Sequence, residues 1–194
     1  MKKFFICFIL LAGAMLMQAQ VRRTPAQRTQ TQQPSTVVVK ETEPLIVNGH
    51  LAFLGIPVKQ SRVIVGNLLK GKGFLQKDDG YGNIRWEGTA FGVKSSVALL
   101  GGYEQGTLTE GISYRELKNY SKTQARNRVN AYLNAFLKAT NGKVIENTMA
   151  NNGIEGEYVE IQAGNGYIKI EYSNQDEVNF DSPYYNVIVL IRED

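Results

Sequence analysis

The chain of 194 residues contains 22 basic and 18 acidic residues and a single cysteine. That cysteine, Cys7, falls within the first 19 residues, so the remainder offers no disulfide, no thiol nucleophile and no thiolate metal ligand. Residues 45–194 hold 16 basic and 16 acidic residues, so the positive excess lies outside them. A nucleic-acid-binding surface needs a clustered positive excess, and we therefore do not expect nucleic acid as a partner.

The first 19 residues predict a cleavable secretory signal peptide. Lys2 and Lys3 precede an apolar run over 4–17, and Ala19 supplies the small residue at a cleavage site. The run is shorter than the roughly 20 apolar residues that cross a bilayer, which argues against a membrane anchor. We expect a periplasmic or extracellular protein with no membrane span after cleavage.

Residues 20–44 predict a disordered spacer ahead of one folded domain. Positions 20–36 consist mainly of Gln, Thr, Arg, Pro and Ser, which offer little apolar surface to bury. Such a composition cannot offset the conformational entropy that ordering would cost. The periodic apolar segments all follow, which places a single α+β domain at 45–194.

The first part of this domain predicts a strand, a helix and three further strands. Residues 51–57 form a short apolar strand that glycine and proline bring to an end. Ser61 is a good N-cap for a helix over 62–70. Strand-like runs follow at 83–91, 93–100 and 106–114.

A second helix beginning after Ser121 is the most strongly predicted element. Ser121 and Gln124 have the spacing of a capping box, in which each side chain satisfies a backbone amide of the first turn. Asn141, followed by glycine, suits a left-handed stop. The predicted buried stripe consists of Ala125, Val129, Tyr132, Leu133, Phe136 and Leu137, whereas Arg126, Arg128 and Lys138 are expected to face solvent.

Residues 156–162 and 167–172 are expected to pair as a β-hairpin across a Gly-Asn-Gly turn. In both arms apolar residues alternate with polar ones, which is typical of a sheet with one buried and one solvated face. A last strand is predicted at 184–192.

The order of these elements favours an α+β fold, because runs of strands follow each helix. We expect an antiparallel sheet with two helices packed on one side. The alternative is two similar helix-plus-sheet units, at about 50–115 and 116–194.

Motifs for catalysis or metal binding are largely missing, and we expect no cofactor and no metal. His50 is the only histidine, and no Gly-x-Ser-x-Gly elbow accompanies it, so it is expected to be a surface or strand-edge residue. Paired carboxylates are the remaining catalytic option. Glu160 and Glu171 would lie on the solvated face of the hairpin beside Lys169, where cross-strand charge pairing is the simpler interpretation.

Aromatic residues provide the candidate binding site, because Tyr and Trp are common anchors of binding surfaces. The candidates that lie close to predicted turns or strand ends are Tyr81, Trp86, Tyr103, Tyr184 and Tyr185. The alternative is that such strand aromatics pack against a neighbouring helix.

Three stretches of the chain have the form of known motifs: 53–58 (FLGIPV) is similar to "FkGIPidG", 68–74 (LLKGKGF) to "kL..kGF", and 88–94 (GTAFGVK) to "G.FaGyk". Through them the chain resembles a group of secreted proteins of unknown function from Bacteroides-type bacteria. The resemblance implies a fold similar to the β-lactamase-inhibitor-protein-like fold, in which a helical unit packs on a four-stranded sheet, often twice. A fold of this kind does not determine function by itself.

These features predict an exported, non-enzymatic binding or envelope-associated module that contacts an envelope protein or glycan. The competing prediction is a cell-envelope or polysaccharide hydrolase that uses surface carboxylates.

Overall fold

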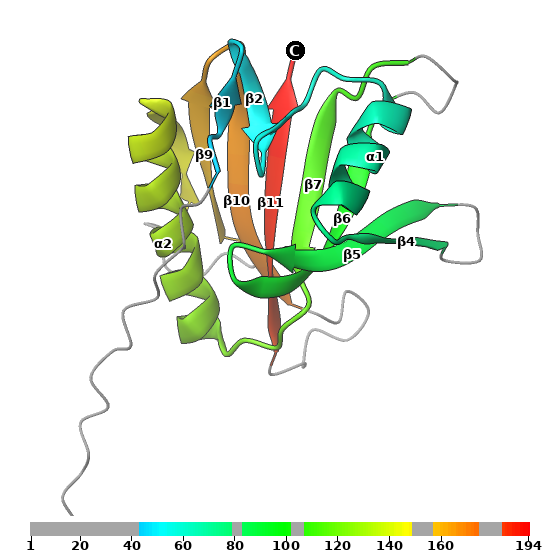
Figure 1. Ribbon diagram of the computed structural model, residues 1–194. Helices are drawn as coiled ribbons and strands as arrows, with labels where there is room; N and C mark the ends of the chain where they lie inside the picture. The colour runs from blue at the N-terminus through cyan, green and yellow to red at the C-terminus, as the bar shows by residue number, and fades with distance from the viewer. Residues whose placement is uncertain (1–42, 79–82, 102–106, 149–156, 175–183) are drawn as a thin grey trace, which may run out of the picture. The chain divides into compact units, whose positions relative to one another are not determined.

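The computed structural model describes residues 43–78, 83–101, 107–148, 157–174 and 184–194 (Figure 1). All of them fall within the unit of the chain that spans 36–194. The predicted signal peptide at 1–19 and residues 20–42 of the predicted spacer lie outside the described residues, as do Tyr81 and Tyr103.

Antiparallel strands form two sheets in the described residues. The main sheet has eight strands in the order β4-β5-β6-β7-β11-β10-β9-β8, and the small sheet has the order β1-β2-β3. The main-sheet strands are β4 (Leu75–Asp78), β5 (Ile84–Ala90), β6 (Val93–Leu100), β7 (Gly111–Glu116), β8 (Lys143–Asn147), β9 (Glu157–Ala163), β10 (Gly166–Asn174) and β11 (Tyr185–Glu193). The small-sheet strands are β1 (Ile46–Val47), β2 (His50–Phe53) and β3 (Ile56–Pro57). With the helices α1 (Arg62–Gly71) and α2 (Lys122–Thr140), they confirm the predicted α+β class.

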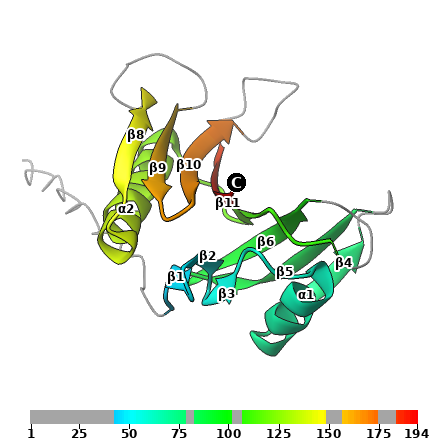
Figure 2. The same cartoon turned by 90° about the horizontal axis from the view of Figure 1, so that it is seen from above.

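Each helix precedes four strands of the main sheet. The chain passes from α1 into β4–β7 and from α2 into β8–β11, and these two halves of the sheet meet where β7 pairs with β11. Figure 2 shows the halves set at an angle, with α1, α2 and the small sheet on the outer side of the bend. The face inside the bend is not covered by any described helix or strand, and we call it the uncovered face.

The core lies between the helices and the other face of the main sheet. One row of buried side chains crosses six neighbouring strands and consists of Val159, Ile170, Val189, Tyr114, Val97 and Trp86. The helices pack onto this row and its neighbours through Val65, Leu69, Ala125, Val129, Tyr132 and Phe136. Because side chains alternate along each strand, the positions between the core residues point to the uncovered face.

Both ends of α2 lie close to where the sequence predicts them. The Ser121 hydroxyl accepts a hydrogen bond from the Gln124 backbone amide, and the Gln124 side chain accepts one from the Ser121 amide. This reciprocal capping box fixes the first turn. Asn141 ends the helix with a left-handed φ of 50°. The predicted start of α1 is also confirmed, because the Ser61 hydroxyl accepts from the Ile64 amide.

Two predicted strands differ from the structure. Residues 51–57 form no single strand but the β2–β3 hairpin, which turns at Leu54 and Gly55 with φ values of 50° and 72°. The strand predicted at 106–114 is β7, which begins at Gly111. A Cβ atom at Gly111 would lie 2.9 Å from the Ile191 carbonyl oxygen, so β7 and β11 approach closely where no side chain intervenes.

Candidate functional site

A buried ion pair joins α2 to β7. Glu116 continues the inward alternation of Ile112 and Tyr114 on β7 and is 0% exposed. Arg128 of α2 is 4% exposed, so the prediction that it faces solvent is wrong. Arg128 lies three residues after Ala125 and four before Tyr132, which places it on the buried stripe of the helix.

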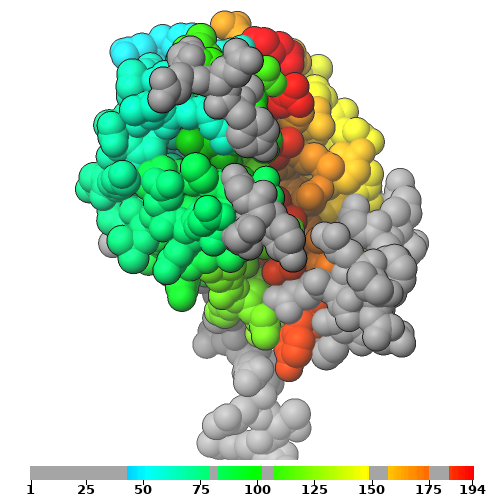
Figure 3. All heavy atoms as spheres, turned by 90° about the vertical axis from the view of Figure 1, so that its right-hand side faces the viewer, coloured from blue at the N-terminus to red at the C-terminus, as the bar shows by residue number. Residues whose placement is uncertain are grey.

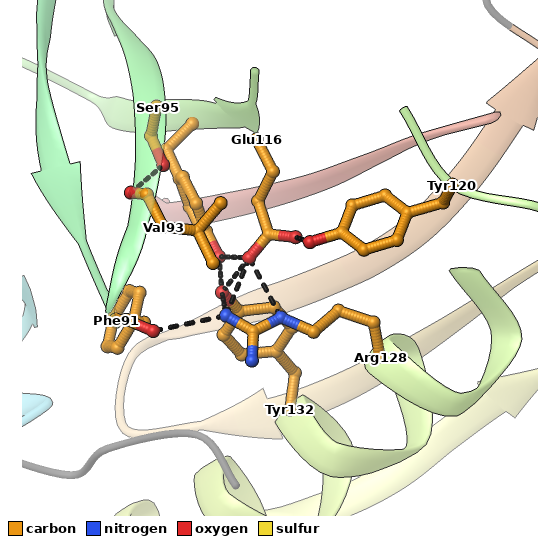
Figure 4. Close-up of polar contacts among 8 residues, drawn as sticks. Phe91, Val93, Ser95, Glu116, Tyr120, Arg128 and Tyr132 are labelled. Carbon is orange, nitrogen blue, oxygen red and sulfur yellow. Dashed lines mark hydrogen bonds and ion pairs between the residues drawn. The ribbon is translucent and has the colours of Figure 1, made fainter. Parts of the chain in front are cut away.

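Tyrosine hydroxyls complete the coordination of Glu116 (Figure 4). Arg128 donates to Oε1 of Glu116 through Nε at 2.9 Å and through Nη2 at 2.7 Å. The Tyr132 hydroxyl donates to the same oxygen at 2.5 Å, and the Tyr120 hydroxyl donates to Oε2 at 2.5 Å. The Tyr114 hydroxyl in turn donates to that of Tyr132. We call these five residues the Glu116 network.

The Glu116 network also contacts the turn between β5 and β6. Nη2 of Arg128 donates to the Phe91 carbonyl at 3.1 Å. Phe91 adopts a φ of 49°, and its ring lies 5.5 Å from the ring centroids of both Tyr114 and Tyr132. The network therefore holds α2, β7 and the β5–β6 turn in one arrangement.

Burial and neighbouring charges shift the pKa values of the network. Burial raises the pKa of Tyr114 and Tyr132 well above the ordinary value, and the adjacent Glu116 carboxylate adds to both increases. For Arg128, burial alone would lower the pKa, but the bond to Glu116 and the neighbouring groups hold it above its usual value. At neutral pH the arginine is therefore charged and the tyrosines are neutral.

Most polar atoms of the Glu116 network are engaged within it. None of its polar atoms is among the described buried polar atoms without a partner, which are Thr109 Oγ1, Glu157 Oε2 and Tyr172 OH. The oxygens of Glu116 are engaged by Arg128 and the tyrosines and are not presented to a substrate. A buried hydrogen-bonded network of this kind favours one packing arrangement, so we interpret it as structural.

We expect the stability of the protein to fall above pH 10 because of the buried tyrosines. Tyr114 and Tyr132 have raised pKa values when folded, so the unfolded chain loses their protons first, near the ordinary pKa of about 10. The stability that these two tyrosines contribute is fully present below that pH. It declines as the pH rises, by about 1.4 kcal/mol per pH unit for each of the two groups. Urea unfolding at increasing pH measures how the free energy of unfolding falls with pH. Tyr132→Phe should remove the contribution of one tyrosine from this slope. Folded protein in which every tyrosine ionises near pH 10, seen by phenolate absorbance, would contradict this expectation.

A second arginine of α2 forms a looser pair with a second buried carboxylate. Nε of Arg126 lies 3.8 Å from Oε2 of Glu157, a side chain that is only 2% exposed. Tyr172, the cross-strand neighbour of Glu157, is also buried, and burial together with Glu157 raises the pKa of its hydroxyl. Both residues lie beneath α2, so neither contributes to the uncovered face.

Two parallel rows of side chains run across the middle of the uncovered face. The first row consists of Glu160, Lys169, Leu190, Ser113, Ala98 and Arg85. The second consists of Tyr158, Glu171, Ile188, Arg115, Ser96 and Glu87. Figure 3 looks into this face from the side, where the orange and red strands β10 and β11 lie recessed behind the green β4–β7 half.

Charges in the β8–β11 half of this face pair with one another. Nζ of Lys169 lies 2.8 Å from Oε2 of Glu171 and 4.3 Å from the centre of the Tyr158 ring. A hydrogen bond to Glu146, with the neighbouring carboxylates, raises the pKa of the Tyr158 hydroxyl. The prediction that Glu160 and Glu171 lie on the solvated face beside Lys169 is confirmed.

Cations dominate the β4–β7 half of the same face. Arg85 forms an ion pair with Glu87 at 3.6 Å. Arg115 and Lys94 are exposed, and neither forms an ion pair or hydrogen bond through its side chain with a described residue. This half therefore carries unpaired positive charge.

The three predicted binding aromatics that the structure describes do not form one cluster. Trp86 is 5% exposed and packs against α1, where a Cβ atom at Gly66 would lie 2.8 Å from its ring. Tyr185 is half-buried, and its ring centroid lies 5.7 Å from that of Tyr172. Tyr184 is 47% exposed just before β11. Their role in binding stays a prediction, as does that of Tyr81 and Tyr103.

Sequence reasoning did not select the aromatics of the uncovered face. Tyr158 and Tyr167 lie there, opposite Glu171 and Gln162 respectively. The alternation of the predicted hairpin places both residues on the solvated side, so that pattern contained the signal.

His50 lies at the start of β2 and joins the small sheet to β11. Its Nδ1 lies 2.9 Å from Oε2 of Glu193, and the backbone amide of Leu51 donates to Oε1 at 2.6 Å. Glu193 is 2% exposed, whereas the His50 side chain is 44% exposed. The pair binds two strands together, in agreement with a strand-edge position for the histidine.

Within the described residues, no three His, Cys, Asp or Glu side chains are placed to hold a metal ion together. Neither helix there is long and apolar enough to cross a membrane. No protein-family model, curated protein or solved structure matches the chain.

Proposed function

We propose that the chain is an exported, non-enzymatic binding module that contacts a protein or glycan of the cell envelope through the uncovered face. The observation that carries this proposal is the organisation of that face. Half-buried aliphatic side chains (Ile188, Leu190 and Ala98) lie at its centre, with tyrosines and charged groups around them. An apolar centre with a polar rim is the usual anatomy of a protein interface.

The competing function, a hydrolase based on Glu160 and Glu171, has less support. A glycosidase needs one carboxylic acid with a raised pKa and a second carboxylate across a cleft. Here Lys169 lies directly opposite Glu160 and forms an ion pair with Glu171. Cross-strand charge pairing on one face of a hairpin is not the arrangement of two carboxylates that flank a substrate in a cleft.

We further propose that the two halves of the sheet are related units, and that the fold is the β-lactamase-inhibitor-protein-like one. Each half consists of one helix followed by four antiparallel strands, and the junction after β7 falls beside the boundary at 115–116. Export rests on the amino-terminal sequence. An N-terminus at or near Gln20 in the purified secreted protein supports it, and an intact Met1 would exclude signal cleavage.

Site-specific photo-crosslinking tests the proposed face. The full-length chain carries benzoylphenylalanine in place of Ser113, at the centre of the uncovered face, or of Val63, which is 62% exposed on α1. Irradiation of producing cells should give a discrete adduct from position 113 and none from position 63. Adducts of equal yield from both positions would contradict the proposal. So would a polysaccharide-cleaving activity that disappears in Glu160→Gln and in Glu171→Gln.

A further inference from the structure

We propose that the uncovered face receives a convex, acidic segment of a protein, whose carboxylates bind Arg115 and Lys94. This inference rests on the proposed function and names the chemistry of the partner. Three observations on the described residues support it: the sign and place of the net charge, the position of Arg115 and the division of the face into zones.

The net charge of the face is positive and is concentrated on one half. Strands β4–β7 present Lys77, Arg85, Lys94 and Arg115 on this face, and their one carboxylate there, Glu87, is engaged by Arg85. Glu110, just before β7, is engaged by Arg192 of β11 at 3.5 Å. In the β8–β11 half, Lys169 lies between the carboxylates of Glu160 and Glu171. A partner therefore gains most from placing negative charge over the first half, because cations outnumber carboxylates there, whereas in the second half Glu146, Glu160 and Glu171 balance Lys143 and Lys169.

Arg115 occupies the position where such a contact is strongest. It lies on β7, at the junction of the two halves, with Ile188 beside it on β11 and Ser96 beside it on β6. Arginine binds a carboxylate through two parallel hydrogen bonds, and the planar guanidinium group is weakly hydrated. An aliphatic neighbour such as Ile188 lowers the local dielectric constant and so strengthens an ion pair formed above it.

The division of the face favours a protein over a uniform polyanion. Carboxylates on β9 and β10 lie beyond the aliphatic centre and would repel a strand of nucleic acid or polyuronate laid across the sheet. A folded protein segment can instead place acidic residues over Arg115 and Lys94 and an apolar residue over Ile188 and Leu190. The recess seen in Figure 3 suits a protruding segment, and not a second copy, whose own face is recessed in the same way.

A displayed library of disulfide-constrained peptides tests this assignment. Selection is carried out on the full-length protein and on the double variant Arg115→Glu/Lys94→Glu. A matched control, Lys122→Glu/Lys138→Glu, makes the same change of charge on exposed positions of α2. We expect the unchanged protein and the control to enrich acidic peptides that carry an apolar residue, and the double variant to lose this acidic bias. Binding of a selected peptide should weaken at least about tenfold in the double variant alone, the scale of losing charge-assisted contacts.

Selected peptides without an acidic bias, or peptides that bind the double variant equally well, would overturn the inference. Polygalacturonate and double-stranded DNA serve as polyanion probes. If either binds as tightly as the selected peptides and with the same dependence on Arg115 and Lys94, the partner is not a protein segment. Failure of the proposed function is recognised by a different result, namely that photo-crosslinking from position 113 gives no specific adduct. Circular dichroism shows whether the double variant is folded, and if it is not, the single variant Arg115→Gln replaces it in the same comparison.

Discussion

Replacing Arg128 by methionine is expected to lower the free energy of unfolding by about 3–5 kcal/mol, the cost of breaking a buried ion pair from one side. The change leaves the Glu116 carboxylate, which is 0% exposed, without its only cationic partner in the described residues. The Tyr120 and Tyr132 hydroxyls still donate to that carboxylate, but they do not balance its charge. Urea unfolding followed by circular dichroism measures the loss.

Two further variants make the Arg128→Met result specific. Lys122→Met, at an exposed position of the same helix, should change stability by no more than about 0.5 kcal/mol. Glu116→Leu/Arg128→Met should recover part of the loss, because removing both charges also removes the buried unpaired one. A loss below about 1 kcal/mol in Arg128→Met would mean that the Glu116 network does not hold α2 to β7.

Trp86→Ala is expected to lower the free energy of unfolding by about 3–5 kcal/mol, as large-to-small changes of core aromatics do. The ring is 5% exposed and lies directly on the backbone of α1 at Gly66, so its removal leaves a cavity between helix and sheet. Nζ of Lys70 lies 5.6 Å from the ring centre and would lose its cation–π contact as well. Circular dichroism follows unfolding in urea, since the variant lacks the only tryptophan of the chain.

The same variant separates the two interpretations of Trp86. If the ring packs in the core, Trp86→Ala unfolds early, whereas Tyr184→Ala, at a side chain that is 47% exposed, stays within about 0.5 kcal/mol of the unchanged protein. Acrylamide should also quench tryptophan fluorescence poorly until the protein unfolds. A stable Trp86→Ala protein that loses binding would instead support the predicted role as a binding residue.

Elements whose capping or turn residues lie next to them in the sequence could be predicted. The Ser121–Gln124 capping box and the left-handed Asn141 define both ends of α2 because the capping hydrogen bonds lie within a few residues. The β9–β10 hairpin was predicted for the same reason, since Gly164 and Asn165 form its turn and both arms alternate. In these places sequence neighbours are also structural neighbours.

Features that depend on distant parts of the chain were missed. β4 has four exposed residues, so no apolar alternation marks it, and it forms only because β5 supplies its hydrogen bonds. Arg128 was expected in solvent because a charged side chain is rarely buried without a partner. The partner, Glu116, lies on another element, although its alternation with Ile112 and Tyr114 already placed it inward. The charge asymmetry of the uncovered face likewise emerges only when the strand order is known.

The central position of β11 has a consequence for how this fold is reached. β11 follows every other described strand in the chain, yet it pairs with β7 and β10 in the middle of the main sheet. Until residues 185–193 are available, β7 and β10 each present an unpaired edge, and no strand connects the two halves of the sheet. Such long-range pairing raises the contact order and slows folding. A chain that emerges from amino to carboxyl end would pass through a state with two open edges, which neighbouring chains can pair with, so its yield should depend on protection from aggregation during that interval.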